Sequence, residues 1–172
     1  MYFDVIQQYA RSLRALDAIL AKAVQYAEAK KFDPDNFCTA RLAPDMLPFS
    51  KQVQIACDSA KRSAAGLIGK EAPVHEDTEK TMAELRQRIA KCLAYLDALK
   101  AEDFAKVTAK TVVKMTSPAG KAMYAEDALL SRSVPNFFFH VTVAYALLRA
   151  GGVDIGKRDY LGELPAMFDL AA

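Results

Sequence analysis

Asn136 and His140 are the two side chains that could do chemistry in the segment Asn136-Phe137-Phe138-Phe139-His140, which is otherwise apolar. Positions i and i+4 lie on one face of a helix, so a helical segment would place the amide and the imidazole next to each other. An imidazole can bind a metal ion or act as a general base, and an amide can bind a ligand through hydrogen bonds. The spacing predicts a metal or small-ligand site. The alternative is a pair of buried polar residues whose neighbours satisfy them and which fix the helix register.

Asp58 is a third candidate for the same site. It lies within a helical pattern beside Gln54 and Lys61, on the flank of a stripe of small residues. It could enter the site from a neighbouring helix, or it could be a solvated carboxylate. Joining the site requires that the helices of Asp58 and His140 lie side by side.

Arg149 belongs to a mixed-charge cluster at the end of the last predicted helix, together with Lys157, Arg158 and Asp159. Salt bridges within this cluster could hold the C-terminal segment in place. Alternatively, Arg149 could contribute to an anion-binding pocket.

Motifs of several other chemistries are absent from the sequence. Neither histidine, His75 or His140, follows the Glu-x-x-His spacing of a carboxylate-bridged di-iron bundle. The sequence also lacks H-E-x-x-H, a Walker loop, G-x-G-x-x-G and G-x-S-x-G.

The bulk composition indicates a single globular domain over residues 1–172. Hydrophobic residues make up 52% of the chain and charged residues 26%, with a net charge of +2. Lys and Arg are spread along the chain, which argues against nucleic acid or an anionic membrane as a partner. No apolar run is long enough to span a bilayer, and the first residues do not resemble a signal peptide. Three widely spaced cysteines, Cys38, Cys57 and Cys92, suit a reducing compartment, so we expect a cytoplasmic protein with unpaired thiols.

Three helices and a hairpin are predicted before the last helix. The spacing of apolar residues predicts a first helix over residues 2–29 and a third that opens near Asp77 or Thr78 and continues to about residue 99. The second helix starts at Pro44 or at Pro48 and ends within residues 66–73. Residues 104–124 are rich in β-branched residues around the turn signal of residues 117–120, which predicts a small hairpin or an extended crossover.

The fourth helix is expected over residues 126–150, with a kink at Pro135 and a stop at Gly151-Gly152. Apolar side chains cover it on every side, which is typical of a helix buried all round. It therefore lies at the centre of the bundle, or it forms a subunit interface as well as part of the core. The four helices together predict an all-α four-helix bundle with a long crossover that carries the hairpin before the last helix.

Two motifs give the chain a family resemblance. The first consists of Ala40-Arg41-Leu42-Ala43-Pro44-Asp45-Met46, Gln52-Val53 and Ala56-x-Asp58-x-Ala60-Lys61; the second consists of Pro135-Asn136-Phe137-x-Phe139-His140, Ala144-Tyr145, Leu148-Arg149, Gly152 and Gly156-Lys157-Arg158-Asp159. With Glu76-Asp77-Thr78, they resemble an uncharacterised bacterial family in the DinB-like, or YfiT-like, superfamily of candidate metalloenzymes. The resemblance implies a four-helix bundle that is often a dimer.

The resemblance also implies a site. Better-studied members of the superfamily bind a divalent metal through three histidines, one on the second helix and two in an H-x-x-x-H on the last. Asn136 and His140 match the H-x-x-x-H, and Asp58 is placed on the second-helix histidine. The implied metal ligands are thus Asp58, Asn136 and His140, a weaker set than three histidines because an amide oxygen is a poor ligand for zinc-like metals.

Two hypotheses follow. In the first, the bundle holds a degenerate site for a weakly bound divalent metal or a small-molecule ligand, a remnant of a metal-dependent transferase or hydrolase. There His140 is a metal ligand or general base, and Asp58, Asn136 and Arg149 contact the ligand. In the second, the protein is a non-catalytic homodimer whose polar trio is an internal hydrogen-bond network. The sequence does not decide whether the protein is an enzyme.

Overall fold

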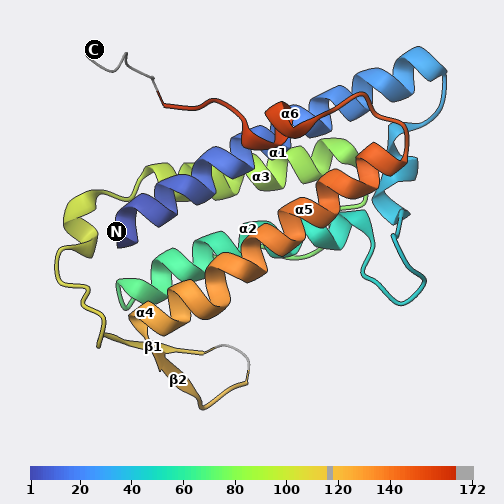
Figure 1. Ribbon diagram of the computed structural model, residues 1–172. Helices are drawn as coiled ribbons and strands as arrows, with labels where there is room; N and C mark the ends of the chain where they lie inside the picture. Colours follow the sequence, from blue (N-terminus) through green and yellow to red (C-terminus); the bar gives the residue numbers. More distant parts are fainter. Residues whose placement is uncertain (116–117, 166–172) are drawn as a thin grey trace, which may run out of the picture.

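Four long helices form the body of the protein in a computed structural model that describes residues 1–115 and 118–165. They are α1 (Tyr2–Lys30), α2 (Phe49–Leu67), α3 (Met82–Asp97) and α5 (Val134–Ala150). Figure 1 shows α2 lying along α5, with α1 and α3 beside each other on the other side of the bundle. The predicted four-helix bundle is confirmed.

Within the described residues, seven short elements connect these helices or follow them. They are η1 (Pro34–Thr39), η2 (Ala101–Phe104), β1 (Val112–Lys114), β2 (Ala122–Tyr124), α4 (Ala125–Asp127), η3 (Ala128–Ser133) and α6 (Lys157–Leu161). Strands β1 and β2 pair antiparallel, with Val113 opposite Met123. The predicted hairpin before the last helix is therefore confirmed, although its turn signal falls partly on residues 116–117, outside the described residues.

The connection between α2 and α3 runs back along the bundle, so these two helices are parallel (Figure 1). Residues of this segment contact the first turns of α2: Asp77 pairs with Lys51, and Glu79 accepts a hydrogen bond from Gln54. The segment therefore places carboxylates beside α2 before α3 begins. Helix α5 runs antiparallel to α2.

Two helix starts differ from the simplest interpretation of the sequence. Helix α2 begins directly after Pro48, so of the two predicted starts Pro48 is right and Pro44 is wrong. Helix α3 begins at Met82, and the predicted start at residue 77 or 78 is also wrong. Thr81 and Glu84 form a capping box in which each side chain accepts a hydrogen bond from the other residue's backbone N–H, which fixes the start of α3.

The last helical run begins near the predicted residue, but its irregularity is a π-helical stretch rather than a simple kink. Helix α4 leads into η3, a π-helix over Ala128–Ser133, and α5 follows with Pro135 in its first turn. Because proline has no N–H to donate, the regular ladder of i to i−4 hydrogen bonds cannot pass through Pro135. π-helical turns are often found at functional sites. The predicted stop is confirmed, since α5 ends at Ala150 and Gly152 adopts a positive φ of 92°.

The core lies between the four long helices, where α2 contributes small residues such as Ala56, Ala60 and Ala64. One side of α5 faces away from this core. Phe139 on α5 is 54% exposed and Leu130 on η3 is 47% exposed. The expectation that the last helix is central and buried all round is therefore wrong within this chain. Among the described residues, no helix is both long and apolar enough to cross a membrane.

Candidate functional site

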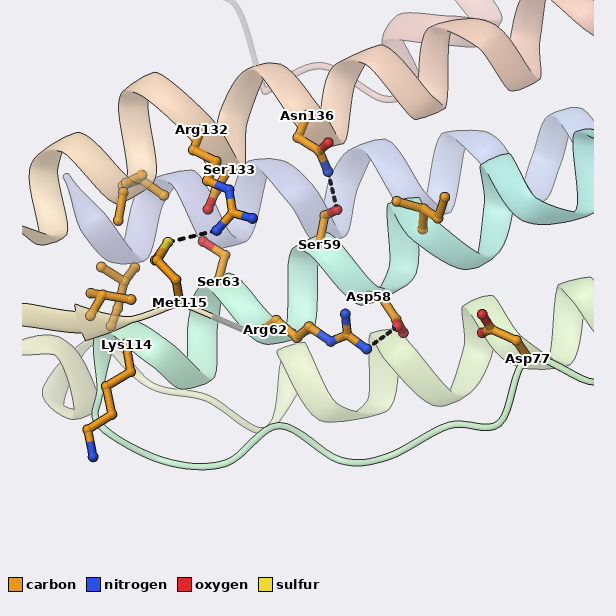
Figure 2. A pocket seen from close by; sticks show the side chains of 15 residues that line it. Asp58, Ser59, Arg62, Ser63, Asp77, Lys114, Met115, Arg132, Ser133 and Asn136 are labelled. Atoms are coloured by element: carbon orange, nitrogen blue, oxygen red, sulfur yellow. Dashed lines mark hydrogen bonds and ion pairs between the residues drawn. The ribbon is translucent and has the colours of Figure 1, made fainter. Parts of the chain in front are cut away.

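A pocket of about 300 Å³ opens between α2, the β1 strand and the π-helical stretch before α5 (Figure 2). Its polar wall combines four small side chains with five charged ones. These are Ser59, Ser63, Ser133 and Asn136, and Asp58, Arg62, Asp77, Lys114 and Arg132. Its apolar wall is formed by Ile55, Leu67, Val113, Met115, Ala128 and Leu129. A volume of this size lies at the lower end of the range for small-ligand sites.

Asn136 is at the wall of this pocket, and its amide nitrogen donates a hydrogen bond of 2.7 Å to Ser59 Oγ on α2. Figure 2 shows these two side chains pointing toward each other across the seam between α2 and α5. The Ser59 oxygen accepts this hydrogen bond, so its own O–H can donate elsewhere.

His140 lies one turn further along α5 and bonds to a different residue of α2. Its Nδ1 is 2.7 Å from Gln52 Oε1, and Gln52 Nε2 donates to the Leu47 carbonyl at 2.9 Å. An amide oxygen only accepts, so His140 donates through Nδ1 and keeps its lone pair on Nε2. The imidazole is 8% exposed, and burial lowers the pKa of His140 below its usual value, which favours the neutral form at pH 7.

Asp58 also lines the pocket, but its carboxylate oxygens bond to cations. Oδ1 lies 3.0 Å from Lys61 Nζ and 2.7 Å from Arg88 Nη2, and Oδ2 lies 2.8 Å from Arg62 Nη2. Lys61 is almost fully buried, at 1% exposure. A buried lysine needs a partner, and Asp58 supplies it. The predicted solvated carboxylate is thus wrong: Asp58 belongs to a buried ionic cluster.

Arg88, on α3, is the centre of this ionic cluster, and its side chain is fully buried. Besides Asp58 it contacts Asp77 at 3.0 Å, Glu79 at 3.0 Å and the Glu76 carbonyl at 2.9 Å. Burial opposes the charge of Arg88, but the bonds to Glu79 and Asp58 outweigh it and raise the pKa further. Burial also raises the pKa of Asp77, yet the hydrogen bonds from Lys51 and Arg88 leave it below its usual value.

Arg149 lies near the far end of α5, and the structure does not bring it to the pocket. Its Nη1 donates to the Val153 carbonyl at 3.3 Å and lies 3.7 Å from Asp154. Nearby, Asp159 pairs with Lys22 of α1 at 2.6 Å. Both salt bridges join a cluster residue to a partner outside the predicted cluster, and the Lys22–Asp159 pair connects the C-terminal segment to α1.

The contacts of Asp58, Asn136 and His140 do not fit a metal centre built from these three residues. Three cations surround Asp58, and their charge would oppose a divalent ion. Among the described residues, Asp58 and Asn136 line the pocket but His140 does not. Within residues 1–115 and 118–165, no three His, Cys, Asp or Glu side chains gather in a way that could hold a metal. Of these three residues, His140 keeps a lone pair, on Nε2, that can bind a metal ion or accept a proton.

Sequence reasoning missed the residues of α2 that meet the last helix. Gln52, Ser59 and Ser63 are spaced by seven and then four positions, so they share one face of the helix. That spacing of polar residues beside a stripe of small residues was a usable signal. Arg132 could not be found in this way because its approach to the pocket depends on the π-helical stretch.

Comparisons with known proteins agree on the family. A family model described as a domain of unknown function, DUF1993, matches residues 1–161. A crystal structure of a DinB family member protein from Shewanella denitrificans is 42% identical, with a TM-score of 0.91, and the match covers 97% of this chain and 95% of that one. No curated protein matches. The chain belongs to the DUF1993 family, and its helical bundle has the fold of a DinB family member.

Proposed function

We propose that this protein binds a small polar molecule in the pocket between α2, η3 and β1. The observation that carries the proposal is the pocket itself, about 300 Å³ in volume, into which two helices direct serine, asparagine and arginine side chains. Ligand sites combine apolar surface with convergent polar groups, and this pocket has both, with more polar than apolar lining residues. Asp58 and Asn136 keep their predicted places in this proposal as lining residues.

The proposal gives Asn136 and Ser59 the role of orienting the ligand by hydrogen bonds. His140 lies outside the pocket wall, with a neutral imidazole held by Gln52. Its role as a general base stays a prediction, supported by the Nδ1–H form, which leaves Nε2 able to accept a proton. Arg149 as a ligand contact has no support from its position.

A second candidate function is the non-catalytic homodimer. Two observations favour it: the one-to-one hydrogen bonds Asn136–Ser59 and His140–Gln52, and the exposed Leu130 and Phe139 on the outer side of the last helical run. Large exposed apolar side chains support an interface between two copies. Light scattering at micromolar concentration tests this, and a monomer would contradict it.

A third candidate function is the binding of a divalent metal, weakly held, with His140 as a ligand. Metal analysis of protein purified without a nickel column tests it directly. Stoichiometric metal that is lost in His140→Ala, with the fold intact by circular dichroism, would support the metal. Absence of metal, together with a lower melting temperature for His140→Ala, would support the hydrogen-bond network.

We also infer one domain and a cytoplasmic location. The buried hydrophobic residues, apart from Ala15 and Ala65, belong to one contiguous cluster, which supports a single domain. Cys38, Cys57 and Cys92 are buried free thiols, which supports a reducing compartment. Burial raises the pKa of the Cys38 thiol to about 11, and for Cys57 the hydrogen bond with Cys92 and then burial raise it, so inert packing thiols are favoured.

The proposed pocket can be tested by blocking it. A ¹⁵N-labelled sample of the full chain is titrated with a set of small polar compounds, both charged and neutral. We expect binders to shift the amide signals of residues 55–67, 112–115 and 128–136. Ser59→Phe should abolish these shifts because the ring fills the pocket, whereas Gln87→Phe on the exposed side of α3 should leave them unchanged. Shifts that persist in Ser59→Phe, or no shifts at millimolar concentration, would contradict the proposal.

A further inference from the structure

We infer that the pocket binds a small organic anion, with a carboxylate or phosphate group held between Arg62 and Arg132 and the serine hydroxyls of α2. The inference rests on the proposed function and names the ligand's chemistry. It comes from how the charges around the pocket are already paired and from which way the hydroxyl groups can donate.

The two carboxylates of the pocket wall are saturated by cations. Asp58 bonds to three cations, and Asp77 lies 3.1 Å from Lys51 and 3.0 Å from Arg88. The side chains that line the pocket or bond to these carboxylates include six cations and, with Glu79 on Arg88, three carboxylates. The cations are Lys51, Lys61, Arg62, Arg88, Lys114 and Arg132. The local charge is therefore positive, although the whole chain carries only +2.

Two guanidinium groups line the pocket, one from α2 and one from η3. Arg62 comes from α2 and is 55% exposed at its side chain, with one bond to Asp58. Arg132 comes from the π-helical stretch, and its Nη1 lies 2.7 Å from Met115 Sδ. Figure 2 shows both at the pocket, while Lys114 turns away. A guanidinium has five N–H donors and no acceptor, so it binds planar anions such as carboxylates well.

The serine hydroxyls are arranged to donate. Ser59 Oγ accepts from Asn136, so its proton is available for a ligand. Ser63 lies beside the hydroxyl of Tyr9. This hydroxyl is fully buried, and among the described residues it has no hydrogen-bond partner of good geometry. A buried hydroxyl normally finds a partner. The Ser63 oxygen can accept from the Tyr9 hydroxyl while its own O–H donates to an anion.

These donors favour an anionic ligand over a neutral or cationic one. An amine would meet positive charge, and an amide would leave part of the donor set unused. Carboxylate and phosphate share the chemistry that the pocket recognises, and the experiment separates them. The apolar wall formed by Ile55, Leu67 and Val113 fits a short hydrocarbon part of the ligand.

The test compares matched probes on the full-length chain. Benzoate, benzamide and phenyl phosphate are titrated into ¹⁵N-labelled protein, and dissociation constants are taken from the amide shifts of residues 55–67 and 128–136. We expect at least one of the two anions to bind about tenfold or more tightly than benzamide, since hydrogen bonds to charged groups are the stronger kind. The better anion identifies the head group.

Single substitutions show which side chains bind the anion. Arg62→Gln and Arg132→Gln should each weaken the anion by about tenfold and leave benzamide unchanged. Arg11→Gln, on the exposed side of α1, is the matched control and should change neither. Tyr9→Phe removes only the buried hydroxyl and should weaken the anion several-fold, on the order of one hydrogen bond, without affecting benzamide.

The two possible failures are distinguishable. If benzamide binds the pocket as tightly as both anions, the anion inference is wrong and the proposed ligand site stands. If anions bind but shift residues outside the pocket, or if Arg11→Gln weakens them as much as Arg62→Gln does, attraction to surface charge explains the binding and the inference is again wrong. If no probe shifts any pocket residue, and the wider compound set also fails, the proposed function is contradicted.

Discussion

Helix α2 takes part in two polar regions that differ in kind. Toward α5 it forms a neutral seam, consisting of the pairs Ser59–Asn136 and Gln52–His140, in which each hydrogen bond joins one residue to one partner. Toward α3 it forms the ionic cluster around Arg88, in which several charges share partners. Asp58 and Ser59 are adjacent in sequence yet serve different regions, because consecutive helical residues point about 100° apart.

Asp58 lines the pocket, yet its oxygens already bond to three cations, so a carboxylate at the wall of a pocket need not contact the ligand. The ionic cluster ties the segment between α2 and α3 to both helices through Asp77 and Glu79. The neutral seam joins α2 to α5, and its Ser59–Asn136 pair lies at the wall of the pocket, where the Ser59 O–H can donate to a ligand. We therefore expect mutations in the cluster to affect stability most and mutations in the seam to affect binding most.

Arg88→Ala should give the largest effect on stability. It removes the cation that joins three carboxylates and leaves buried charges unpaired, which we expect to cost about 4–5 kcal/mol of unfolding free energy. Urea denaturation measures it. Arg86→Ala is the matched control on the same helix, since its partly exposed pair with Asp17 should be worth about 0–1 kcal/mol. Equal losses for the two variants would remove the distinction between the regions.

Asp58→Asn should come next, at about 3 kcal/mol, because it leaves the buried Lys61 and Arg88 with fewer partners. The same variant separates structure from metal binding. If Asp58 serves the ionic cluster, its replacement lowers stability and leaves any metal content unchanged. A stable Asp58→Asn protein that loses metal would instead favour the resemblance-based site.

His140→Leu should cost about 1–3 kcal/mol, since it leaves Gln52 Oε1 buried without its donor. The variant also changes the pH dependence. Burial lowers the pKa of His140, so below about pH 6.5 the unfolded chain binds a proton that the folded chain does not. The free energy of unfolding therefore decreases as the pH is lowered. Burial, with Lys61 and Arg88, lowers the pKa of His75 in the same direction.

Melting temperatures of wild type and His140→Leu between pH 5 and pH 8 separate the two histidines. We expect the melting temperatures of both proteins to stay constant above about pH 7. On acidification the wild type should lose more stability, because it has one more histidine whose pKa is lowered in the folded state. Parallel pH curves would mean that His140 titrates in the folded state much as it does in the unfolded chain.

The sequence predicts the fold far better than the site. The helical spacing of apolar residues determines α1 and α5, and Gly151-Gly152 marks the end of α5, because these signals are local. Asp58 is where local reasoning failed. Its partner Arg88 lies thirty residues away on another helix, and no local pattern joins the two residues, so the cluster could not be foreseen. The spacing of Asn136 and His140 placed both side chains toward α2, where each bonds to a different residue, but only Asn136 lines the pocket.

Asn136→Ala should give the smallest loss of stability and the clearest change in binding. Asn136 is exposed and its bond to Ser59 is a single neutral one, so we expect about 0.5–1 kcal/mol. Without this donor, Ser59 is free to accept a hydrogen bond from solvent and is no longer oriented as a donor to the pocket. Binding of the anionic probe should therefore weaken while unfolding stays nearly unchanged. Arg88→Ala should instead lower stability strongly, because it removes the partner of Asp58 and Asp77, so the two variants together decide whether α2 separates folding from recognition on its two sides. A large loss of stability in Asn136→Ala, with binding intact, would show that the seam is structural as well.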